Sequence, residues 1–246
     1  MQNSDHRTAG YQRWQKLTFL HWRIPAERLQ TLVPDELTVE QFDGSAWLGL
    51  VPFSMERIRP WWSPPIPGIS WFLETNVRTY VVDRRGIRGV WFFSLDANKQ
   101  LAVSVATRFW HLPYKMAKMT LTAKTHQGNA EQLRVEYHGL RRDLPHAEYR
   151  GSINVNLSRP AVPATPCTLD HFLVERYILF AQHRDGRLRT GEVHHEPYRI
   201  RPADSCEVTQ TLTAAMGCPI PSEHRPEHVV YSEGVNVRVS PLTSIG

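Results

Sequence analysis

Polar side chains alternate with less polar ones along residues 74–80. A β-strand points every second side chain to the same face. One face of this segment therefore carries a carboxylate, an amide, a guanidinium and a phenol, namely Glu74, Asn76, Arg78 and Tyr80. This polar row must face either water or a polar cavity, and the choice between them largely decides what the protein does.

A second group of reactive side chains lies around Pro113, where His111, Tyr114 and Lys115 follow one another closely. Carboxylate, guanidinium, phenol and ammonium groups are the parts needed to hold a small polar acid and to move a proton. Glu74 and Arg78 would equally suit ion pairs on a solvated sheet face, where such pairs are common and individually weak. On the pattern alone, the two interpretations have equal weight.

Composition indicates an ordinary globular protein. The chain has 246 residues, of which 41% are hydrophobic and 22% charged, and its formal net charge is +5. Lysine and arginine are dispersed among carboxylates, which argues against nucleic-acid binding. No apolar run approaches the roughly 20 residues that span a bilayer, and residues 1–8 lack the apolar core of a secretion signal. We therefore expect a cytoplasmic protein with no membrane partner, in which the three cysteines are idle or buried thiols.

Standard cofactor and nucleophile motifs are missing from the sequence, so we expect no bound cofactor. Cys206, Cys218, His224 and His228 resemble a zinc set, but the cysteines are too far apart, and Pro226 would break the helix that the two histidines need. The neighbours His194 and His195 would point to opposite faces of a strand. We expect no metal site.

The elements that must position these groups are mainly strands joined by short turns, which predicts a largely antiparallel sheet. Turn signals separate the expected strands, which are 37–42, 45–53, 74–82, 90–95, 117–125, 131–137, 148–155, 229–231 and 235–239. Helices are expected at 25–33, from Asp96 or Asn98 to Trp110, and from a Thr168 cap through Phe180. The loop Pro60–Gly68 is rich in proline and tryptophan, and we expect it to fold back as a wall or cover of the ligand pocket. We expect one domain over residues 1–246.

Several blocks of the sequence resemble the YqjF-like family of bacterial proteins. The resemblance is carried by Phe72–Val81, Gly89–Ala97 and Leu112–Tyr114, and continues through Phe172–Tyr177 and Val193–Pro197. This family is similar in fold to acetoacetate decarboxylase. The resemblance implies an α+β fold dominated by strands: a large, curled, mainly antiparallel sheet shaped as a conical barrel, with a central cavity and a few packed helices. It also favours the inward orientation of the polar row.

The same resemblance bears on the chemistry. The decarboxylase forms a Schiff base through the first lysine of a Pro-Lys-Lys segment, which Pro113-Tyr114-Lys115 matches here, and Glu74 matches a glutamate of its pocket. Tyr114 thus stands where the reactive amine should be. Because a phenol cannot form an iminium, decarboxylation by that route should be lost.

We therefore expect a protein that binds a small polar or carboxylate-bearing molecule in a central cavity. In this hypothesis Glu74 is a general acid/base or an anchor, Tyr114 donates a hydrogen bond or proton, and Lys115 supplies positive potential. Arg78, Asn76 and His111 would bind the ligand, and His111 would help to set protonation states near neutral pH. One alternative is a decarboxylase or aldolase-like enzyme that forms its Schiff base at Lys115. Another is a structural protein without a catalytic site, whose sheet face assembles into a homo-oligomer.

Overall fold

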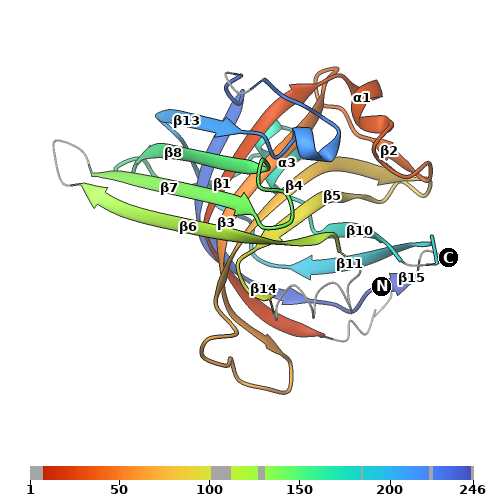
Figure 1. Cartoon of the computed structure of the whole chain (residues 1–246), viewed down its shortest axis with the longest axis horizontal. Coiled ribbons are helices and arrows are strands. Elements are labelled where there is room, and N and C mark those ends of the chain that lie inside the picture. The colour runs from red at the N-terminus through yellow and green to blue at the C-terminus, as the bar shows by residue number, and fades with distance from the viewer. Residues whose placement is uncertain (1–7, 101–111, 127–130, 184, 222–223, 245–246) are drawn as a thin grey trace.

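The computed structural model describes residues 8–100, 112–126, 131–183, 185–221 and 224–244, and within these ranges most of the chain forms one large sheet (Figure 1). The strands are β1 (Gly10–Ile24), β2 (Leu37–Val39), β3 (Ala46–Pro60), β4 (Phe72–Asp83), β5 (Arg88–Ala97), β6 (Tyr114–His126), β7 (Gln132–Arg141), β8 (Glu148–Asn156), β9 (Val162–Pro163), β10 (Ile178–Gln182), β11 (Leu188–His194), β12 (Arg199–Pro202), β13 (Ser205–Gln210), β14 (His228–Val239) and β15 (Thr243–Ser244). The helices of the described part are α1 (Ala26–Gln30), α3 (Leu169–Val174) and the short 3-10 helix η1 (Ala214–Met216). None of the described helices is long and apolar enough to cross a membrane.

The sheet curls so far that seven of its strands pair in a closed circuit. From β5 they run through β10, β11, β14, β1, β3 and β4, and β4 pairs with β5 again. Four further strands, β6, β7, β8 and β13, extend from β5 as a second layer, seen at the left of Figure 1. The expected curled, strand-dominated fold is confirmed. The sheet is mixed, since β5 pairs in parallel with both β6 and β10.

The register across β4, β5 and β6 decides which side chains share a face. Glu74 pairs with Ala97 on β5, and Leu95, two residues before Ala97, pairs with Tyr114 on β6. Because paired residues point to the same side of a sheet, Glu74 and Tyr114 lie on one face. The residue after Tyr114, Lys115, pairs with Asp96 and belongs to the opposite face.

The polar row of β4 faces the interior. Glu74, Asn76, Arg78 and Tyr80 are all buried, with exposed fractions of 3%, 5%, 9% and 0%. They share this side of the sheet with a large apolar cluster that includes Phe19, Leu95 and Phe172 of helix α3. The solvated-face interpretation of the row is therefore wrong.

The helix expected after Thr168 is shorter than predicted. Thr168 caps it, with its hydroxyl accepting a hydrogen bond from the His171 N–H at 3.3 Å, but α3 ends at Val174. Ile178–Gln182 instead forms β10, which pairs with β5 and β11. The segment is flanked by partner strands on both sides, so its backbone groups pair within the sheet.

Three further expectations need correction. Asp96 does not cap a helix, because β5 continues to Ala97; most of the predicted helix that followed lies outside the described residues. The turn at Asp43-Gly44 closes only a single bridge between Phe42 and Ser45, since β2 pairs with β4 instead of β3. The two C-terminal strands are one continuous strand, β14.

Candidate functional site

Glu74 and Tyr114 meet at a cavity of about 310 Å³. The Tyr114 hydroxyl donates a hydrogen bond of 2.7 Å to Glu74 Oε2. The two residues come from β4 and β6, with β5 between them, and the small side chain of Ala97 opposite Glu74 lets them reach each other across β5. The second carboxylate oxygen of Glu74 has no hydrogen-bond partner among the described residues. This oxygen can donate a proton to a ligand in the cavity when the carboxyl group is protonated, and can accept one when it is ionised.

Burial makes Glu74 titrate near neutrality. Loss of solvation raises its pKa from the usual 4.5 to about 7, the hydrogen bond from Tyr114 lowers it, and the nearby Asp96 raises it further. Burial and the Glu74 carboxylate together raise the pKa of Tyr114 well above 10, so the phenol stays protonated. Glu74 is thus poised to exchange a proton near pH 7, as a general acid or base requires.

The cavity walls are mostly apolar. They combine Trp14 of β1, Phe72 of β4 and Leu95 of β5 with residues of the β3–β4 loop. Three loop residues, Pro64, Ile66 and Ile69, close one side. The loop expected to act as a wall does so in part. A few polar groups within apolar walls are typical of small-molecule sites.

A buried ion pair supports the opposite face of the sheet beneath Glu74. Asp96 accepts hydrogen bonds from Nε and Nη2 of Arg141 at 2.8–3.0 Å, and both side chains are almost fully buried. Burial raises the pKa of Asp96, although its bonds to Arg141 lower it. The Asp96 charge also raises the pKa of Glu74 on the other face. Sequence reasoning missed it, because the two residues are 45 positions apart and Asp96 looked like a helix cap.

Lys115 lies away from the cavity. Its ammonium pairs with Asp143 at 3.2 Å, and both side chains are about half exposed. No lysine is found among the described residues that line the cavity. Tyr114, and not Lys115, therefore occupies the cavity position on this stretch of chain.

Arg78 belongs to a separate buried network beyond the cavity. Its guanidinium donates to the Leu173 carbonyl at 3.0 Å and to the Tyr80 hydroxyl at 3.3 Å. Tyr80 also bonds His21 at 2.7 Å, and His21 bonds His228 at 2.9 Å. These contacts tie β1, β4 and β14 to α3. The structure brings Glu74 and Tyr114 together but holds Arg78 elsewhere.

The two remaining candidates have different outcomes. Asn76 is buried between Glu74 and Arg78 on the same face, and its side-chain oxygen lacks a hydrogen-bond partner among the described residues. His111 lies outside the described residues.

The two histidines that resembled part of a zinc set have other partners. His228 bonds Asp170 at 2.9 Å as well as His21, and His224 bonds Glu227 at 3.0 Å. In the described ranges no group of three or more histidine, cysteine or acidic residues is arranged to hold a metal ion.

Comparison with solved structures places this fold among acetoacetate decarboxylase-like proteins. An acetoacetate decarboxylase-like enzyme from Sphingomonas wittichii RW1 superimposes with a TM-score of 0.68 at 15% identity, covering 98% of this chain and 94% of the other. The enduracididine biosynthesis enzyme MppR in complex with pyruvate gives a TM-score of 0.63 at 10% identity, covering 100% and 93%. At these identities the likeness establishes the fold alone.

Sequence comparison identifies the family. The uncharacterized protein YqjF from Bacillus subtilis (strain 168) is 33% identical over 224 residues, which is 91% of this chain and 88% of that protein. The model of the DUF2071 family, described as an uncharacterized conserved protein, matches residues 11–236. The resemblance drawn from the sequence blocks is thus confirmed, and the chain belongs to the DUF2071 family.

Proposed function

We propose that this protein binds a small molecule with an apolar body and one carbonyl or carboxylate group, and that Glu74 shares or transfers a proton with that group. The observation that carries this proposal is the Glu74–Tyr114 hydrogen bond at the wall of an apolar cavity. A volume of about 310 Å³ suits a ligand of modest size.

The charge balance at the cavity favours an oxygen acceptor on the ligand. With a pKa of about 7, Glu74 carries a proton in a large fraction of molecules near neutrality and can donate it to a carbonyl or carboxylate. A ligand carboxylate would share that proton, because two bare carboxylates at hydrogen-bonding distance repel each other. The fold neighbour MppR, which was solved with pyruvate, lends support to an oxo acid as the ligand class.

Schiff-base catalysis finds little support here. Tyr114 faces the cavity where an amine would be needed, and Lys115 is paired with Asp143 on the other face. Any reaction at this site would run by proton transfer at Glu74, with the Tyr114 hydroxyl steadying the carboxylate. An enolisation next to a ligand carbonyl is the simplest step of this kind.

The test is calorimetric titration with pyruvate, acetoacetate, 2-oxohexanoate and the matched neutral ketone 2-hexanone. We expect the longer oxo acid to bind more tightly than pyruvate, because its chain fills the apolar walls. Glu74→Gln should weaken this binding by roughly tenfold to a hundredfold, the effect of losing the group that shares a proton with the ligand. Lys115→Gln is the matched control and should bind like the wild type.

Borohydride reduction with acetoacetate separates this proposal from Schiff-base chemistry. Mass spectrometry should find no reduced adduct on Lys115. An adduct there, together with loss of binding in Lys115→Gln, would refute the role given to Tyr114.

A further inference from the structure

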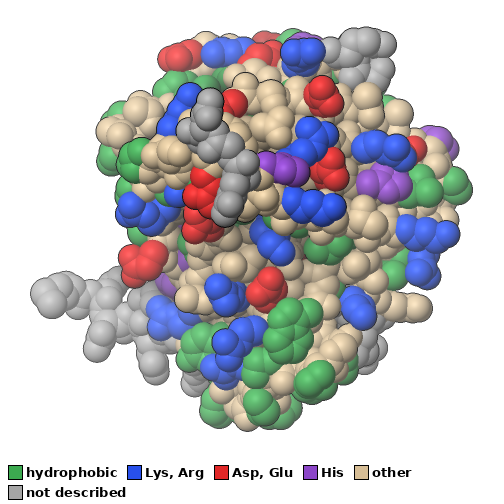
Figure 2. Space-filling view, turned by 90° about the vertical axis from the view of Figure 1, so that its left-hand side faces the viewer, with side chains coloured by type: hydrophobic (Ala, Val, Ile, Leu, Met, Phe, Trp, Pro, Cys, Tyr) green, Lys and Arg blue, Asp and Glu red, His purple; other side chains and the backbone are tan. Residues whose placement is uncertain are grey.

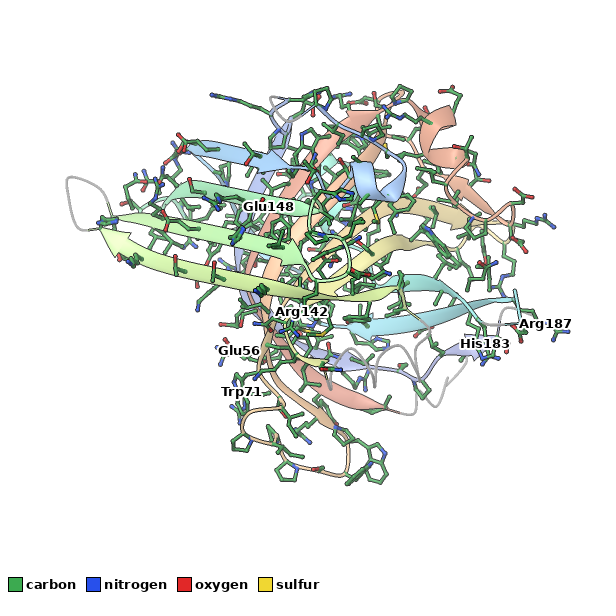
Figure 3. The ribbon with its side chains drawn as sticks, viewed as in Figure 1. Glu56, Trp71, Arg142, Glu148, His183 and Arg187 are labelled. Carbon is green, nitrogen blue, oxygen red and sulfur yellow. The ribbon has the colours of Figure 1, made fainter. Side chains whose placement is uncertain are left out.

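Large apolar side chains are exposed together on the loop between β3 and β4. Trp61 and Trp62 are 64% and 71% exposed, and Ile66, Ile69 and Trp71 are 50%, 41% and 40% exposed. The loop extends below the body of the molecule in Figure 1, and in Figure 3 the labelled Trp71 marks the point where the chain leaves it for β4. Single exposed apolar residues need no explanation, but a cluster on one projecting loop indicates an interaction surface.

Hydrogen bonds give this loop a defined shape. The Ile66 N–H bonds the Ser70 hydroxyl at 2.8 Å, and the Ser70 N–H returns to the Ile66 carbonyl at 2.9 Å. The base of the loop is fixed by bonds from the Ile58 N–H to the Ser70 carbonyl and from the Trp61 N–H to the Ala9 carbonyl. These hydrogen bonds therefore fix the backbone that carries the two tryptophans.

Four arginines gather beside the loop. Arg13, Arg57, Arg59 and Arg238 line a groove of about 610 Å³ across β1, β3 and β14. None of them forms an ion pair with a carboxylate of the described residues, and Glu196 is the only acidic residue among the described lining. Such an excess of positive charge is suited to an anionic partner.

We propose that this face docks on the surface of an anionic lipid bilayer, with the tryptophans at the interface and the arginines against the phosphate headgroups. Tryptophan favours this position because its ring is apolar and its N–H is polar. Figure 2 shows hydrophobic side chains gathered at the lower end of one face, with Lys and Arg side chains next to them. The expectation of no membrane partner rested on the lack of a spanning segment, and a docking surface of this kind needs none.

Charge favours a bilayer over a second copy of the chain. A symmetric contact through this face would set the arginine groove of one copy near that of the other, and like charges repel. A lipid surface supplies the opposite charge and accepts the apolar loop at the same time. Gln12 and Arg59 line both the groove and the cavity, so the two adjoin on this face.

The experiment is co-sedimentation of the full chain with phosphatidylcholine vesicles, with and without phosphatidylglycerol, combined with tryptophan fluorescence. Binding should require phosphatidylglycerol and weaken with salt, and the emission should shift to the blue. Trp61→Ser/Trp62→Ser should abolish the shift and most of the binding. Arg13→Gln/Arg238→Gln should weaken partitioning roughly 25-fold, from about fivefold per charge near an anionic surface.

The matched control removes two arginines from another face. Arg134→Gln/Arg150→Gln lies on β7 and β8, where Arg150 pairs with the Glu148 labelled in Figure 3. It should bind vesicles within about twofold of wild type, after allowance for the general loss of positive charge. Equal weakening by both arginine variants, or absence of vesicle binding, would overturn the proposal. So would dimers that dissociate in Trp61→Ser/Trp62→Ser without any lipid dependence, because this would identify a protein interface.

Discussion

At the scale of single residues, the chemistry of the site depends on a carboxyl group that burial makes reluctant to ionise. Tyr114 is the one described hydrogen-bond donor that favours the charged form of Glu74, and it opposes a larger desolvation effect. A buried carboxylate such as ionised Glu74 lowers the stability of the fold near neutral pH, where the group can exchange a proton. Such a cost is common for functional sites.

Glu74→Gln should therefore stabilise the protein at pH 8 more than at pH 5. The pKa of Glu74 is raised from 4.5 to about 7 on folding, so the folded state binds more protons than the unfolded state between these values. Its contribution to stability falls as pH rises through this window, by about 2–3 kcal/mol between pH 5 and pH 8. Glutamine carries no such dependence. Urea unfolding of both proteins at the two pH values measures the difference.

The control for this prediction is Glu136→Gln, an exposed carboxylate whose pKa is lowered by its hydrogen bond from Arg134. It should show no gain at pH 8. A Glu74→Gln effect that is the same at pH 5 and pH 8 would mean that Glu74 is ionised throughout.

Tyr114→Phe should raise the pKa of Glu74 further. It removes the hydrogen bond that stabilises the carboxylate, while burial and Asp96 still act on it. Carboxyl chemical shifts of carbon-13-labelled glutamate, followed by NMR across the pH range, measure the change. Tyr149→Phe is the matched variant, because that buried phenol bonds Thr75 instead of Glu74. A shift in Tyr149→Phe as large as in Tyr114→Phe would contradict the direct role of Tyr114.

At the scale of elements, the sequence predicted those strands and turns whose conformation depends on residues close to each other in the chain. The β4–β5 hairpin forms between the expected strands 74–82 and 90–95, and in the turn at 83–86 Gly86 takes a φ of 81°. Strand β1 was not predicted, because residues 17–22 are buried on both faces and so show no polar–apolar alternation. The apolar spacing of segment 178–182 continues that of α3 and predicts helix, but pairing with β5 and β11 makes this segment a strand.

The Asp96–Arg141 pair joins β5 to the end of β7 in the second layer. Asp96→Asn should reduce the free energy of unfolding by about 3–5 kcal/mol, because it leaves the Arg141 guanidinium buried without a counter-ion. It should also lower the pKa of Glu74, whose ionisation the Asp96 charge opposes. Denaturant unfolding and the glutamate titration measure these two effects.

Asp143→Asn is the corresponding control, since it removes a half-exposed pair with Lys115. Its effect on the free energy of unfolding should stay below about 1 kcal/mol. Similar losses in the two variants would show that the Asp96–Arg141 pair is as accessible to water as the surface pair.

At the scale of the whole molecule, closure of the strand circuit places two polar clusters in one interior. One contains Glu74 and Tyr114, and the other contains Arg78 and His21. The family resemblance, more than any periodicity, indicated that the β4 row faces inward, because alternation alone allows either side. It did not separate Arg78 from Glu74. That division follows from how α3 covers the interior and offers the Leu173 carbonyl to Arg78, a contact between residues 95 positions apart.

The two clusters should oppose each other in the pH dependence of global stability. Burial, His228 and Arg78 lower the pKa of His21 well below 6.5, so its contribution to stability is lost as pH falls below 6.5. The contribution of Glu74 is lost as pH rises from 4.5 to about 7. Between about 4.5 and 6.5 the two slopes oppose each other in the wild type. His21→Gln should therefore become less stable, relative to wild type, as pH rises through this range, and Glu74→Gln more stable. Thermal unfolding of the three proteins at closely spaced pH values tests this, and parallel curves would show that neither buried group changes its protonation on unfolding.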